Sequence, residues 1–152
     1  MPSSVENTDR VGHVIGRPRT WLRLDAGVVL VASLATFHLT HQHWWLYPAL
    51  LFVPDVFMLG YLRNTRVGAF FYNTGHSYFV PAAVLTYGWL GHHAFASAIA
   101  IIWLGHVGWD RFFGYGLKYD SGFAHTHLGD LKGPGARQRD PRESRVTDAR
   151  KP

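Results

Sequence analysis

The sequence of 152 residues contains no cysteine. This absence excludes disulfides, thiolate-ligated zinc and iron–sulfur clusters, so a metal site in this chain would have to use histidine, aspartate, glutamate or asparagine. Charged side chains are also scarce in the middle of the chain, where positions 24–110 hold only Asp25, Asp55, Arg63, Arg66 and Asp110. A soluble domain of that length would carry many more. The middle of the chain is therefore expected to lie in lipid.

The chain is nevertheless basic overall, with a formal net charge of +5. Its lysines and arginines fall in three places: residues 10–23, the pair Arg63 and Arg66, and the stretch from Arg111 onward. The last of these also mixes in acidic residues. A surface that binds nucleic acid gathers its basic residues on one face of a folded domain, so we predict no nucleic-acid partner.

Four apolar segments follow one another, each close to the ~20 residues that cross a bilayer core. They are Trp21–Thr40, Trp44–Leu62, Val67–Leu90 and Ala94–Phe113. Their short connections predict antiparallel neighbours. We therefore predict an all-α fold, an integral membrane four-helix bundle over residues 21–129. Residues 1–20 lack apolar periodicity and are predicted to be a disordered basic lead, and residues 130–152 a disordered charged tail.

The positive charge also predicts the orientation of the bundle. Every lysine and arginine lies within residues 10–23, in the second connection or from Arg111 onward, which places both termini in the cytoplasm of a bacterial inner membrane. No small-x-small cleavage site follows the first apolar segment, so we expect a membrane helix there and not a secretory signal. The opposite side is rich in histidine: His38, His41, His43, His92 and His93. These are ligands for an external metal or simply neutral loop residues.

Polar side chains recur at one depth inside the apolar segments. Counted at ~1.5 Å per residue, Asp55, Asn73, His76 and His106 lie roughly 9–14 Å below the inner face, and Asp110 lies nearer that face. Residues 73 and 76 share a helix face at i, i+3, as do residues 106 and 110 at i, i+4. Ionisable residues within a membrane are costly and mark functional sites. We expect a polar pocket that opens to the cytoplasm.

Histidine and aspartate suit zinc, manganese or iron, and an open position on such an ion activates water. We therefore expect a divalent-metal site, with Asn73 in support. The predicted metal ligands are Asp55, His76, His106, Asp110 and His127.

A metal in this position suggests a hydrolase that acts on a lipid-like or phosphorylated small molecule. In that hypothesis Asp110 or Asp55 acts as the base, and Arg111 or Lys118 holds an anionic group.

Two other interpretations of these residues remain open. In the first, they only bond helices together: Asp55 to Asn73, His76 to a backbone carbonyl, and Asp110 to an arginine. In the second, the chain is a non-catalytic membrane module. Such a module would hold haem between His76 and His106, relay protons or bind a partner protein.

Four short motifs carry a family resemblance that runs from about Leu22 to Gly129. They are Pro54-Asp55, Asn73-x-x-His76, His106-x-x-x-Asp110-Arg111 and Thr126-His127-Leu-Gly129. On these motifs the chain resembles the small bacterial membrane-protein family catalogued as domain of unknown function 4260. The resemblance implies the four-helix membrane fold and brings no established activity.

More loosely, the order of a Pro-Asp helix, an Asn/His helix and a His-x-x-x-Asp helix is similar to that of certain inner-membrane metal-dependent hydrolases. Their His-Arg-Gly and Thr-His-Ser elements are absent from this chain. The hydrolase hypothesis draws on this analogy.

Overall fold

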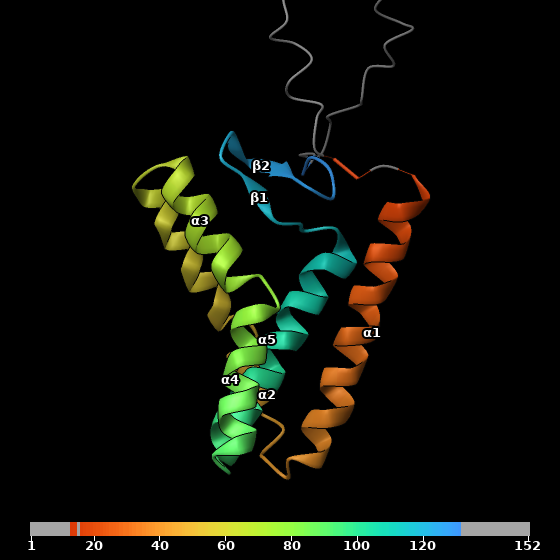
Figure 1. Ribbon diagram of the computed structural model, residues 1–152, viewed down its shortest axis with the longest axis vertical. Helices are drawn as coiled ribbons and strands as arrows, with labels where there is room; N and C mark the ends of the chain where they lie inside the picture. The colour runs from red at the N-terminus through yellow and green to blue at the C-terminus, as the bar shows by residue number, and fades with distance from the viewer. Residues whose placement is uncertain (1–12, 15, 132–152) are drawn as a thin grey trace, which may run out of the picture.

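The computed structural model describes residues 13–14 and 16–131, and within them the fold is all-α apart from one small hairpin. The elements are α1 (Arg17–Leu39), α2 (Leu46–Leu51), the 3₁₀ helix η1 (Val53–Leu62), α3 (Thr65–Gly75), α4 (Phe79–Leu90), α5 (Ala94–Phe113), β1 (Lys118–Tyr119) and β2 (Gly122–Thr126) (Figure 1). Most of the predicted disordered lead, and all but the first residues of the predicted tail, lie outside the described residues. The predicted all-α class is confirmed.

The structure corrects the boundaries of the predicted helices. The first and fourth apolar segments each form one helix, and α1 begins at Arg17, before the predicted start at Trp21. The second segment starts as α-helix and continues as the 3₁₀ helix η1, which begins with Val53 and Pro54. The third segment is not one helix, because α3 ends at Gly75 and α4 begins at Phe79.

Proline explains the break in the third segment. Pro81 has no N–H to donate to the carbonyl four residues earlier, but it is tolerated in the first turn of α4, where that donor would be unused. The carbonyls freed at the break find side-chain donors on α5. The indole N–H of Trp103 donates to the Gly75 carbonyl at 2.6 Å, and Arg111 donates to the His76 carbonyl at 3.3 Å.

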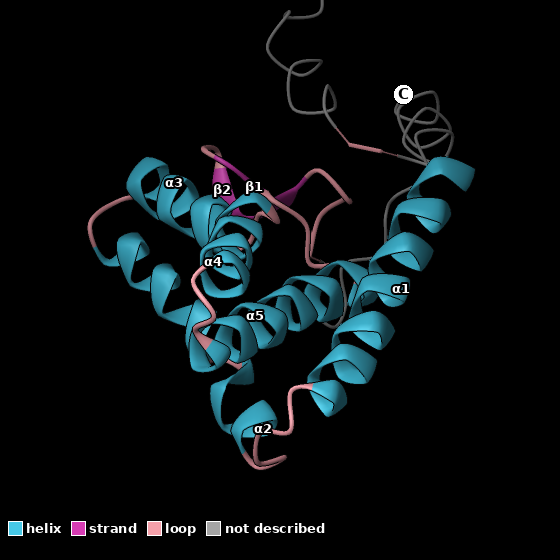
Figure 2. Ribbon diagram, turned by 60° about the horizontal axis from the view of Figure 1, so that its bottom comes forward, coloured by secondary structure: helices cyan, strands magenta, loops and turns pink. Residues whose placement is uncertain are grey.

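Helix α5 is the centre of the arrangement. Helix α1 packs along one side of it and α4 along another, while α3 packs against η1 (Figure 2). The backbones of α1 and α5 come close together at Gly108, where an added Cβ would lie 2.9 Å from the Ala26 carbonyl oxygen. Near the other end of α5, Phe37, Tyr47 and Ile102 belong to the buried apolar core. Residues on α5 can therefore contact every other helix of the bundle.

A hairpin that the sequence did not predict closes one end of the bundle. Gly114, at φ 98°, ends α5 in the left-handed conformation that glycine adopts most easily. Strands β1 and β2 then pair antiparallel and lie across the end of the helices, between α3 and α1 (Figure 1). The Val14 N–H donates to the His127 carbonyl at 2.8 Å, which ties the chain before α1 to the segment after β2.

Among the described residues, α1 is the one helix that is long and apolar enough on its own to cross a membrane. Only 17% of its most apolar window is buried inside the protein. A core helix of a soluble protein would be mostly buried. Large apolar side chains are exposed on the other helices as well, among them Leu62, Phe70, Phe79 and Trp89. An apolar exterior of this extent indicates an interaction surface for a membrane or a partner.

Candidate functional site

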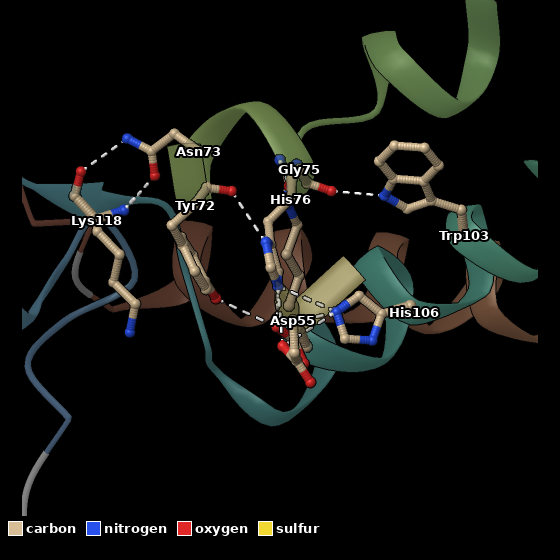
Figure 3. Close-up of polar contacts among 10 residues, drawn as sticks. Asp55, Tyr72, Asn73, Gly75, His76, Trp103, His106 and Lys118 are labelled. Atoms are coloured by element: carbon tan, nitrogen blue, oxygen red, sulfur yellow. Dashed lines mark hydrogen bonds and ion pairs between the residues drawn. The ribbon is translucent and has the colours of Figure 1, made fainter. Parts of the chain in front are cut away.

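Four ionisable side chains converge between η1, the α3–α4 break and α5 (Figure 3). Asp55 comes from η1, His76 follows the last residue of α3, and His106 and Asp110 lie one turn apart on α5. One ligand atom from each lies within 4.8 Å of the others. The two imidazoles are almost fully buried, at 3% and 1% exposed, whereas the side chain of Asp55 is 31% exposed. The cluster therefore opens on the Asp55 side.

The distances within this four-residue cluster match those between the ligands of one metal ion. The two Nε2 atoms, of His76 and His106, lie 3.0 Å apart. Asp55 Oδ1 lies 3.3 and 3.6 Å from them, and Asp110 Oδ2 lies 3.5 and 3.9 Å from them. Ligand atoms at the usual metal–nitrogen distance in a tetrahedral site lie about 3.3 Å apart. The five distances that involve an imidazole nitrogen lie within about 0.6 Å of this value, and the two carboxylate oxygens lie within 4.8 Å of each other, so the four side chains could bind a single ion after small shifts.

Hydrogen bonding directs a lone pair of His76 toward the centre of the cluster. His76 Nδ1 lies 2.9 Å from the Tyr72 carbonyl, which can only accept, so this nitrogen carries the proton and a neutral His76 turns a lone pair toward the cluster. On the far side of the His106 ring, Nδ1 has only a weak contact with the Leu51 backbone and no well-formed hydrogen bond. Two imidazole nitrogens 3.0 Å apart beside two carboxylates require a proton or a metal ion between them.

Tyr72 is a member of this site that the sequence analysis missed. Its ring stacks on the His76 imidazole with the centroids 3.7 Å apart, and its hydroxyl donates to Asp110 Oδ2 at 3.2 Å. Tyr72 thus fixes both a histidine and a carboxylate of the cluster. The signal in the sequence was its position four residues before His76, on the same helical face.

The structure places two of the predicted site residues elsewhere. Asn73 does not bond Asp55: its side-chain N–H donates to the Lys118 carbonyl at 2.9 Å, and its oxygen accepts the Lys118 N–H at 2.7 Å. His127 is not among the four clustered residues, because its Nδ1 accepts the Leu117 N–H at 2.8 Å on the other side of α5. Asn73 therefore holds strand β1 against α3, and His127 lies apart from the four clustered residues.

The two predicted cationic residues also occupy different places. Lys118 is buried at 4% exposed, with its ammonium 4.9 Å from the centre of the Tyr72 ring and 3.9 Å from that of Phe123. Burial lowers the pKa of Lys118 to about 8, although the Asp110 carboxylate acts in the opposite direction. Arg111 instead lies over the Tyr78 ring at 4.3 Å, away from the cluster. Only Lys118 therefore lies beside the carboxylates.

Comparison with known proteins identifies the family of this chain. The family described as Domain of unknown function (DUF4260) matches residues 19–131. The chain belongs to this family. No curated protein and no solved structure matches it. The DUF4260 match includes the four clustered residues, Tyr72 and Lys118. Its description names no activity, so the chemistry of this DUF4260 chain has to be argued from its residues.

The buried ammonium gives a pH-dependent prediction. Folding lowers the pKa of Lys118 from 10.5 to about 8, so between these values the unfolded chain binds more protons and stability rises with pH. Replacing the ammonium in a Lys118→Met variant should therefore stabilise the protein at pH 7, by on the order of 2–3 kcal/mol. This gain should shrink as the pH rises toward 10.5. Thermal unfolding at a series of pH values measures it.

The matched control is Arg66→Met, which removes an exposed cation and should change stability little at any pH. A Lys118→Met variant that is no more stable than the parent at pH 7 would contradict the assignment of Lys118 as a desolvated cation.

Proposed function

We propose that this DUF4260 protein is a multi-pass protein of the bacterial inner membrane, whose four-residue cluster binds one divalent metal ion. We further propose that the site hydrolyses a phosphorylated, lipid-like substrate near the cytoplasmic face. The observation that carries the proposal is the convergence of Asp55, His76, His106 and Asp110 inside an apolar helical bundle. Such a set is costly to bury unless a cation is bound.

The lengths of the helices support the membrane location. At the usual rise per residue, α1 spans about 34 Å and α5 about 30 Å, and α2 with η1 spans roughly 29 Å. Each length is close to the hydrocarbon thickness of a bilayer. The connection from η1 to α3, with Arg63 in it and Arg66 in the first turn of α3, lies at the same end as the hairpin and the start of α1, whereas the two histidine-rich connections lie at the opposite end (Figure 1). This separation of charge agrees with cytoplasmic termini.

The ligand set favours a six-coordinate ion. A tetrahedral zinc ion would use all four side chains and keep no position for water, as in structural zinc sites. Manganese or iron would bind the same two imidazoles and two carboxylates and keep two positions free. Asp55 is the most exposed of the four, so substrate and water would approach from its side. Hydrolysis therefore fits Mn²⁺ or Fe²⁺ better than Zn²⁺.

The proposed hydrolysis needs a metal ion, a proton acceptor and a cation that attracts the phosphate. The ion would supply Lewis acidity and an activated water. The second carboxylate oxygen of Asp55, at the open side, would accept the proton of the attacking water. Tyr72 keeps Asp110 in place through its hydroxyl. Of the two cations considered from the sequence, the ammonium of Lys118 would attract the phosphate, because Arg111 faces away.

A proton relay is the second candidate function. Hydroxyl, carboxylate and imidazole groups follow one another within 3.5 Å from Tyr72 through Asp110 and His76 to Asp55. Haem is less suited, because axial nitrogens lie on opposite sides of a macrocycle. The two Nε2 atoms here are 3.0 Å apart, with carboxylate oxygens beside them. Metal content separates a metal site from a relay.

The first test measures that content. Protein purified in detergent and loaded with Mn²⁺, Fe²⁺ or Zn²⁺ should retain about one ion per chain after gel filtration. His106→Ala and Asp55→Ala should each weaken binding roughly tenfold or more, because every ligand of a four-ligand site contributes. His125→Ala, which removes an imidazole bonded to Ser121 outside the cluster, should bind like the parent. Absence of a bound ion in the parent protein would favour the relay.

The second test measures hydrolysis. The Mn²⁺-loaded protein in mixed micelles should release a phosphorylated headgroup or inorganic phosphate from a phospholipid or lipid phosphate. Asp55→Asn should reduce kcat by roughly a hundredfold or more, as expected for loss of a general base. Arg63→Gln, which changes an exposed basic residue, should leave kcat unchanged. Normal metal binding without any release would leave the metal site intact and refute the hydrolase.

The third test concerns topology and uses the absence of cysteine. In a His43→Cys variant the new thiol should react with a membrane-impermeant maleimide added to intact spheroplasts. In a Thr65→Cys variant it should react only after the membrane is permeabilised. Both positions are exposed, His43 between α1 and α2 and Thr65 at the start of α3, at opposite ends of the bundle. Labelling of the Thr65→Cys variant from outside would contradict the proposed orientation.

A further inference from the structure

A second pocket lies on the side of α5 that faces α1. Its cavity has a volume of about 120 Å³ and contains none of the four clustered residues. Its polar lining comes from Asp25 on α1, Tyr78 at the break before α4, Arg111 on α5 and His127 after β2. Four segments far apart in the sequence thus deliver polar groups to one small space inside an otherwise apolar region.

Three of these groups have hydrogen-bond donors that the protein does not fully use. Within the described residues Arg111 forms no ion pair, and its buried Nε has no partner. The hydroxyl of Tyr78 is also buried without a partner. His127 accepts the Leu117 N–H at Nδ1, so the proton of its neutral ring is on Nε2 and available to donate. Guanidinium, phenol and imidazole donors together match a phosphate or carboxylate.

We propose that this pocket binds the phosphate of a membrane phospholipid whose headgroup carries an amine. The apolar lining supports a lipid and not a free phosphate ester, because Leu22 and Val29 line the pocket and Leu22 is 42% exposed on the outer surface of α1. A diacyl lipid could lay its chains along that surface and its phosphate against Arg111. An unfilled site would leave buried donors unsatisfied, which is costly.

Asp25 decides which headgroup fits. A carboxylate in a pocket for an anion repels it, unless the ligand also brings a positive charge. Asp25 is exposed at the mouth of the pocket, while Arg111 is more deeply placed. A zwitterionic headgroup such as phosphoethanolamine would set its phosphate on Arg111 and its ammonium on Asp25. A phosphoglycerol headgroup has no ammonium to pair with the Asp25 carboxylate, so a lipid with that headgroup should bind less tightly.

This site rests on the proposed membrane location and not on the proposed metal chemistry. Its structural link to the metal cluster is the His76 carbonyl, which accepts from Arg111 at 3.3 Å. Metal content can therefore be measured in each variant of the pocket, so that failure of the lipid site is distinguished from failure of the metal site.

The experiment titrates the detergent-solubilised protein with short-chain phosphatidylethanolamine, short-chain phosphatidylglycerol and free phosphoethanolamine, and follows the bound ligand by native mass spectrometry. The parent should bind phosphatidylethanolamine most tightly. Arg111→Gln should weaken that binding roughly tenfold or more, as expected for a charged hydrogen bond. Tyr78→Phe should weaken it severalfold while keeping the ring beneath the guanidinium. Arg63→Gln, an arginine lost outside the pocket, should bind like the parent.

Asp25→Asn tests the amine separately, since it should abolish the preference for phosphatidylethanolamine over phosphatidylglycerol. Free phosphoethanolamine bound as tightly as the lipid would overturn the lipid assignment. Equal binding of both lipids to the parent would overturn the role of Asp25. If Tyr78→Phe keeps the parental lipid affinity and a normal metal content, the pocket is not the lipid-binding site. This variant tests the proposal even if Arg111→Gln fails to fold.

Discussion

The arrangement of this protein depends on one contact, the approach of two buried imidazole nitrogens to 3.0 Å beside two carboxylates. In an apolar surrounding such groups cannot be left to water, so each needs a fixed partner. Tyr72 provides two of these partners, a carbonyl for His76 and a hydroxyl for Asp110. The contact between the two Nε2 atoms is satisfied either by a proton on His106 or by a bound metal ion. The proposed metal site draws on all four side chains and not on any single residue.

The break between α3 and α4 is what delivers His76 to this centre. A continuous helix would have kept the carbonyls of Gly75 and His76 inside its own ladder. The break frees them, and a carbonyl buried away from water needs a donor within the protein. Trp103 and Arg111 supply these donors from α5. The same helix that carries His106 and Asp110 thus also fixes the main chain around His76, so the geometry of the cluster and the stability of the break are coupled.

Much of this was accessible from the sequence, and the exceptions have physical causes. The spacing of His106 and Asp110 placed them on one helical face, and the predicted topology grouped Asp55 and His76 with them at one depth. The sequence did not show the break after Gly75, because apolar character continues through it and Pro81 is compatible with either a kinked helix or two helices. It also missed the hairpin, since Lys118–Tyr119 and Gly122–Thr126 are too short to show a strand period. Without the hairpin, neither the partner of Asn73 nor the distance of His127 from the cluster could be inferred.

Two consecutive residues of α5 face two chemically different sites. Asp110 faces the cluster with His106, whereas Arg111, about 100° further round the helix, faces α1 and the second pocket. A shift of α5 by one residue that put Arg111 in the place of Asp110 would also put Val107 in the place of His106, leaving a guanidinium beside His76 and Asp55. The close contact at Gly108, where the backbones of α1 and α5 meet, opposes such a shift. The packing of these two helices therefore determines which side chain enters which site, and the chemistry proposed for each depends on that register.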